Sequence, residues 1–70
     1  MFKIRWIRRS VRVKTIAVEE VRSDDIEKLF EECREELLDR RRKDGFKAPN
    51  GFEIIDPETG KPVKTWVVQD

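Results

Sequence analysis

The 70-residue sequence contains no histidine and no tyrosine, and it has a single cysteine, Cys33. Without histidine it lacks the commonest metal ligand and general base of proteins. A single cysteine excludes an internal disulfide and a thiolate zinc cluster. A chain this short also rarely encloses a deep cleft. We therefore expect no enzyme, no metal site, no cofactor and no small-molecule substrate.

Long apolar runs are missing too, since none exceeds three residues. A helix that spans a membrane needs about 20 predominantly apolar residues. We therefore expect no membrane association and a cytoplasmic location. A chain of this length buries only about 60% of the surface that it exposes when unfolded, so we expect a single domain, residues 1–70, with a thin core.

Residues 2–18 show the alternation of apolar and polar side chains that is typical of β-strands. Alternate residues from Phe2 to Trp6 share one strand face, and a turn without Gly or Asn is expected around residues 8–10. β-branched residues then resume, and their change of phase predicts a bulge near Thr15. These features predict a β-hairpin at the start of the chain.

From Ser23 onward the apolar residues recur every three or four positions, which indicates an amphipathic helix. The apolar stripe consists of Ile26, Leu29, Phe30, Cys33 and Leu37. Ser23 is expected to cap the N-terminus of this helix, and Gly45 to end it with a positive φ. Cys33 is then a small core residue and not a reactive thiol.

The segment DPETG, residues 56–60, has the residues of a tight hairpin turn. Pro57 presets the backbone of a type I turn, the Asp56 side chain can accept from backbone amides, and Gly60 supplies a positive φ. A second hairpin is therefore expected over residues 54–66.

Hairpin, helix and hairpin together predict an α+β domain with ββαββ connectivity. A right-handed crossover would place strands one and four side by side and parallel, in the order 2-1-4-3. This plan resembles the β-grasp family of protein G and ubiquitin, and the segment VEEVRSDDIEKL is similar to the entry into the ubiquitin helix. The resemblance implies one helix packed on a four-stranded mixed sheet. Pro62 departs from it, because it would lie in a central strand. The alternative is a sheet with a different strand order.

Charge is distributed unevenly, although 16 basic and 15 acidic residues leave a net charge of only +1. Residues 1–14 contain no acid, whereas residues 19–39 contain ten acids. In a β-grasp plan the tip of the first hairpin and the C-terminus of the helix lie at the same end of the sheet. We call this end the basic pole. It is expected to consist of Arg8, Arg9, Arg12, Arg40, Arg41, Arg42, Lys43 and Lys47. The alternative is a solvated surface without a partner, since basic residues also complement helix dipoles and protect strand edges.

A four-stranded sheet with one helix has one open face, and some apolar residues are expected there. Ile7 should point away from the helix, and adjacent residues such as Ile54 and Ile55 must face opposite sides. Of Trp66 and Val67, one is expected inside and one outside. The candidate patch on the open face therefore consists of Ile7, Ile55, Trp66 and Val67.

Our first hypothesis is a small non-enzymatic interaction module that docks another macromolecule, a protein first of all, through the open sheet face and the basic pole. The alternative is a nucleic-acid-binding protein whose basic pole contacts phosphates. A third interpretation, a designed sequence without a natural function, rests on the consensus-like DPETG turn. Homo-oligomerisation is left open.

Overall fold

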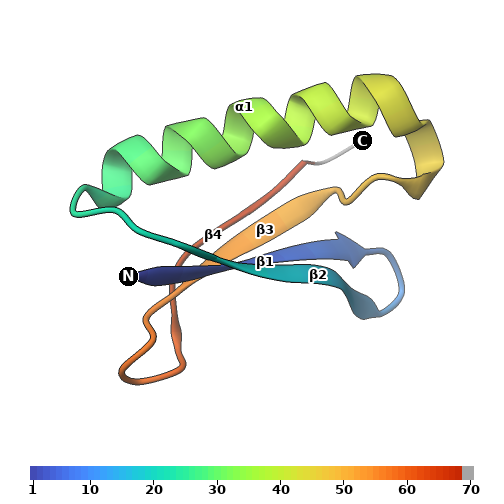
Figure 1. The fold of residues 1–70 in the computed structure, drawn as a ribbon. Helices are drawn as coiled ribbons and strands as arrows, with labels where there is room; N and C mark the ends of the chain where they lie inside the picture. The colour runs from blue at the N-terminus through green and yellow to red at the C-terminus, as the bar shows by residue number, and fades with distance from the viewer. Residues whose placement is uncertain (69–70) are drawn as a thin grey trace.

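The computed structural model describes residues 1–68, apart from the side chain of Phe46. Its elements are β1 (Phe2–Arg9), β2 (Val13–Val21), α1 (Ile26–Asp44), the short 3-10 helix η1 (Gly45–Lys47), β3 (Gly51–Ile55) and β4 (Pro62–Val67). The strands form one antiparallel sheet, and α1 lies across one of its faces (Figure 1). The predicted α+β class and the hairpin, helix, hairpin sequence of elements are confirmed.

The strand order is β2-β1-β3-β4, so the predicted order 2-1-4-3 is wrong. The two strands of the second hairpin have exchanged places relative to the prediction. β3 lies beside β1, and these two central strands are antiparallel. The sheet is consequently not mixed, and the strand order implied by the β-grasp resemblance is not present. Strand directions are the same in both orders, however, so each end of the sheet holds the segments that were expected there.

Burial explains why β3 and not β4 takes the central place. Phe52 and Ile54 of β3 are fully buried, whereas β4 begins at the exposed Pro62 and contains the half-buried Lys64. Burying a large apolar side chain stabilises a fold by about 1.5–3 kcal/mol, which favours the central place for the more apolar strand. Proline cannot donate to a sheet and is accommodated at an edge. Pro62 was therefore the sequence signal for the observed order.

The core lies between α1 and the two central strands. Leu29, Cys33 and Leu37 of the helix stripe are buried against the residues of β1 and β3 that face the helix, which are Ile4, Trp6, Phe52 and Ile54. Phe52 is central, with its ring 5.8 Å from that of Trp6 and 5.5 Å from that of Phe30. The predicted core stripe, including Cys33, is confirmed.

Asp25, and not Ser23, caps the N-terminus of α1, so the predicted N-cap is wrong. The Asp25 carboxylate accepts hydrogen bonds from the backbone N–H groups of Glu27 and Lys28 at 3.1 and 3.2 Å. Ser23 lies two residues earlier, and its hydroxyl accepts from the N–H of Asp25 itself. At the other end Gly45 has a φ of 60°, as predicted, and its N–H donates to the carbonyl of Arg41. Among the described residues, no helix combines the length and apolar composition that crossing a bilayer requires.

The DPETG turn is present as predicted, whereas the turn of the first hairpin spans residues 10–12 and not 8–10, because the pairing of β1 with β2 continues to Arg9 and Val13. In DPETG the N–H of Gly60 donates to the Asp56 carbonyl at 2.8 Å, the Asp56 carboxylate accepts from the N–H of Glu58, and Gly60 has a φ of 72°. In the first hairpin Trp6 pairs with Ala17 and Ile7 with Thr15, which leaves Ile16 as the extra residue of a bulge. The bulge predicted near Thr15 is therefore confirmed.

Candidate anion-binding site

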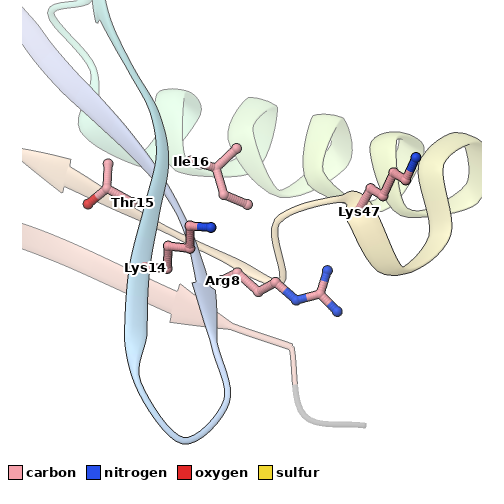
Figure 2. A pocket seen from close by; sticks show the side chains of 5 residues that line it. All are labelled: Arg8, Lys14, Thr15, Ile16 and Lys47. Atoms are coloured by element: carbon pink, nitrogen blue, oxygen red, sulfur yellow. The ribbon is translucent and has the colours of Figure 1, made fainter.

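Three basic side chains from three elements line one hollow beside the first hairpin. Arg8 comes from β1, Lys14 from β2 and Lys47 from η1, and Thr15 and Ile16 complete the lining. The hollow has a volume of about 430 Å³ and no acidic residue in its lining. Figure 2 shows Arg8 and Lys14 extending toward the same side, while Thr15 points away from them. We call this site the basic hollow.

Strand pairing brings the first two cations together. Arg8 lies directly opposite Lys14 in the register of β1 and β2. The bulge at Ile16 decides on which face Lys14 lies, because the extra residue shifts the alternation of β2 and turns Lys14 to the helix side. Like charges directly opposite each other in a sheet are destabilising. The arrangement therefore lowers stability unless an anion binds between the two cations.

The end of α1 brings the third cation to the hollow. The positive φ of Gly45 ends the helix, and η1 turns the chain toward the sheet, where Ala48 and Pro49 are buried. The N–H of Ala48 donates to the carbonyl of Gly45 and closes this turn. Lys47 comes directly before the buried Ala48 and is itself exposed. Its position is therefore fixed at the backbone while its side chain is free to meet a ligand.

Asn50 fastens the first hairpin to the start of β3. Its side-chain oxygen accepts from the N–H of Arg9, and its side-chain amide donates to the carbonyl of Arg9, both at 2.7 Å. Its own N–H donates to the carbonyl of Ile7 at 3.0 Å. The backbone beside Arg8 is thereby held from two sides, which limits the conformational freedom that the hollow would lose on binding.

At the helix end of the basic pole, the cations whose partners are described are paired with acids. Arg40 contacts a carboxylate oxygen of Glu36 at 2.9 Å and lies over the Trp6 ring at 4.5 Å. Asp39 is shared by Arg42 at 3.8 Å and Lys43 at 3.0 Å. The hydrogen bond from Lys43, with smaller effects of the Lys43 and Arg42 charges, lowers the pKa of Asp39. Arg41 lies half-buried on the same turn.

At the hairpin end, the described residues offer the cations no such partner. Within residues 1–68 no ion pair involves Arg8, Arg9, Arg12, Lys14 or Lys47. The segments that carry the predicted basic residues, namely the tip of the first hairpin, the C-terminal part of α1 and η1, lie at one end of the molecule (Figure 1). Of these residues, those of the hairpin and Lys47 face solvent without a carboxylate partner within residues 1–68.

The predicted residues of the open face are only partly on that face. Trp66 lies on the helix side, with its ring 6.0 Å from that of Phe52, and Val67 lies on the open side. Ile7 is on the open side but buried, because Gly51 lies opposite it and leaves room for the side chains of Ile7 and Val67. The apolar patch is therefore smaller than expected.

A charged pair occupies the middle of the open face. Arg5 contacts the Glu53 carboxylate at 2.8 Å and donates from Nε to the hydroxyl of Thr15 at 2.6 Å. The cores of protein–protein interfaces are depleted of charged residues, so this face does not resemble such a core.

Sequence reasoning did not assign Lys14, Thr15 and Ile16 of the lining to the site, nor Asn50 beside it. Lys14 could have been found, because a bulge near Thr15 was expected and its effect on the alternation follows from it. Asn50 carries no comparable signal, since its bonds to Arg9 join residues far apart in sequence.

Cys33 is a buried core thiol, and its burial, with smaller effects of Glu36, Glu19 and Glu32, raises its pKa to about 11. Because the thiolate is the nucleophilic form, the thiol is unreactive at neutral pH. In the described part of the chain no three His, Cys, Asp or Glu side chains are grouped to hold a metal ion.

Comparisons with protein-family models, with curated proteins and with solved structures find no match to this chain.

Proposed function

We propose that the protein is a small non-enzymatic interaction module that docks a polyanionic macromolecule at the basic hollow. The observation that carries this proposal is the convergence of Arg8, Lys14 and Lys47, from three elements, around a hollow without a carboxylate. The exposed Arg9 and Arg12 extend the same positive surface to the tip of the hairpin.

Electrostatics favours a partner with several negative charges. Two like charges about 4 Å apart repel by about 1 kcal/mol even in water, and the repulsion grows as they are desolvated. An anion placed between Arg8 and Lys14 replaces this repulsion by two attractions. A field of one sign also raises the rate at which an oppositely charged partner arrives.

The open sheet face has a secondary role in this proposal. Ile55 and Val67 are half-buried, and the charged pair Arg5–Glu53 lies on the same face. This surface offers limited apolar area, so it supplements a charged contact and does not replace it.

The proposal is tested by the binding of two polyanions, duplex DNA and poly-glutamate, measured by fluorescence anisotropy across a salt series. The wild type is expected to bind at least one of them at low salt. Neutralising the hollow by Arg8→Gln, Lys14→Gln and Lys47→Gln should weaken that binding about a thousandfold at about 0.1 M salt, which is about tenfold per phosphate contact for duplex DNA.

A matched control neutralises three basic residues of the opposite end, Arg22→Gln, Lys28→Gln and Lys61→Gln, which also lack an ion pair among the described residues. This control removes the same charge and should weaken binding far less. Equal losses in the two variants, or no binding of either polyanion by the wild type, would overturn the proposal. Protection of the Cys33 thiol confirms that each variant is folded.

A further inference from the structure

The β1–β2 hairpin has cations on both of its sides. Arg8 and Lys14 lie on the helix side, in the basic hollow. Arg9 follows Arg8 in β1, and successive side chains of a strand point to opposite faces, so Arg9 lies on the open side. Arg12 is in the turn and is exposed. The hairpin is therefore a two-stranded ribbon with positive charge on its two faces and its tip.

The ribbon is accessible along its outer strand as far as Glu20. Every residue of β2 from Val13 to Glu20 is exposed, because α1 packs over the central strands and leaves the β2 edge uncovered. At the apex Val11 is 98% exposed. The bonds between Asn50 and Arg9 hold the last residue of β1, so the turn beyond it extends from a fixed backbone as a preorganised element.

We propose that the anionic partner is double-stranded DNA and that the β1–β2 hairpin lies in one of its grooves. This proposal rests on the proposed docking function and specifies its partner. The DNA major groove admits a two-stranded β-ribbon, and its two walls carry phosphates. Cations on both sides of a ribbon match two phosphate walls, whereas a single acidic peptide presents charge to one side only.

The placement of the aromatic residues separates duplex from single-stranded nucleic acid. Single strands are bound by stacking their bases on exposed aromatic side chains. Trp6 and Phe52 are buried, and Phe2, Phe30 and Trp66 pack against the core. Among the aromatic side chains that the structure describes, none is available to the basic hollow, which favours contacts to the phosphate backbone.

The contacts expected are those of Arg8, Arg9, Arg12, Lys14 and Lys47. Five phosphate contacts predict that the logarithm of the binding constant falls with the logarithm of the salt concentration with a slope of about −4.5. Because no base-reading geometry is needed, affinity should depend little on DNA sequence.

The test compares a duplex DNA, one of its single strands and poly-glutamate with the intact protein, by fluorescence anisotropy across a salt series. We expect the duplex to bind most tightly. The variant Arg9→Gln/Arg12→Gln, which changes only exposed residues at the tip, should bind the duplex about a hundredfold more weakly at about 0.1 M salt and reduce the slope by about 2. The matched variant Arg42→Gln/Lys43→Gln should change the slope by less than one contact.

The other possible outcomes each overturn one or both of the proposals. Binding of poly-glutamate that depends on the hollow, without binding of the duplex, leaves the docking function standing and overturns duplex recognition. Tighter binding of the single strand, or a tip variant with an unchanged slope, also overturns it. Absence of binding to all three probes overturns both proposals.

Discussion

The two parts of the basic pole differ in how their charges are balanced. On α1, positions three and four residues apart lie side by side, so Arg40, Arg42 and Lys43 find Glu36 and Asp39 on the same helix. Near the tip of the hairpin there is no acid, since residues 1–18 contain none, and the strand pairing places Arg8 opposite Lys14. Charge at one end of a molecule is therefore available to a ligand only where the local geometry provides no internal partner.

Among single substitutions, the largest expected effect comes from placing an acid near the tip of the first hairpin. Ile16→Glu places a carboxylate in the basic hollow, where it can pair with Arg8 and Lys14 and occupy the place of a bound anion. Loss of two phosphate contacts predicts duplex binding about a hundredfold weaker at about 0.1 M salt, measured by anisotropy. The control Val18→Glu adds the same charge to the same exposed strand, on the open face. Equal losses in both would show that net charge, and not the hollow, decides binding.

The second test removes Asp39, the acid that Arg42 and Lys43 share at the C-terminal end of α1. Asp39→Asn releases Arg42 and Lys43 and should strengthen duplex binding about tenfold, the equivalent of one added phosphate contact. Glu35→Gln removes one negative charge from an exposed residue of the same helix that has no ion pair among the described residues, so it serves as the control. A gain of equal size in both variants would contradict the role of internal pairing.

A smaller effect concerns stability and again separates the two groups of cations. Arg40 contacts the Trp6 ring and Glu36, so Arg40→Ala should lower the free energy of unfolding by about 1 kcal/mol in urea denaturation. Arg8→Ala removes a cation that faces Lys14 and has no acidic partner, so it should be neutral or slightly stabilising. If Arg8→Ala destabilised the protein as much as Arg40→Ala, the distinction between paired cations on the helix and unpaired cations on the hairpin would be wrong.

The smallest effect is the titration of Asp39. NMR titration should find the pKa of Asp39 below the ordinary aspartate value, mainly because of the hydrogen bond from Lys43. The pairing therefore stabilises the folded state above the pKa of the unfolded chain, and this contribution is lost as the pH falls through the lower, folded pKa. Lys43→Ala should return the pKa of Asp39 toward its ordinary value, and Arg42→Ala should shift it less. The opposite ranking would show that the longer Arg42 contact dominates.

Much of the local structure could be predicted from residue patterns. The apolar stripe of α1, the DPETG turn and the bulge near Thr15 follow from interactions between residues close in sequence. The N-cap was missed because Ser23 and Asp25 are both good caps, and the choice between them depends on where the first helical turn begins. Strand order was missed although Pro62 indicated an edge strand.

The candidate site was less predictable than the fold. Arg8 and Lys47 were expected at the basic pole, but their convergence with Lys14 depends on the register of the first hairpin and on the turn after Gly45. The burial of Ile7 depends on Gly51, which lies opposite it on another strand. Contacts of this kind join distant parts of the chain, and no local pattern encodes them.

The sequence by itself determined the elements, the turns and the absence of acid from the first 18 residues, because these follow from composition and from the short-range geometry of helices and strands. Only the tertiary structure decided that β3 lies beside β1 and that three cations from β1, β2 and η1 surround one hollow. The physical reason is that strand order is set by the total apolar surface buried against α1, a sum over all elements that no single segment contains.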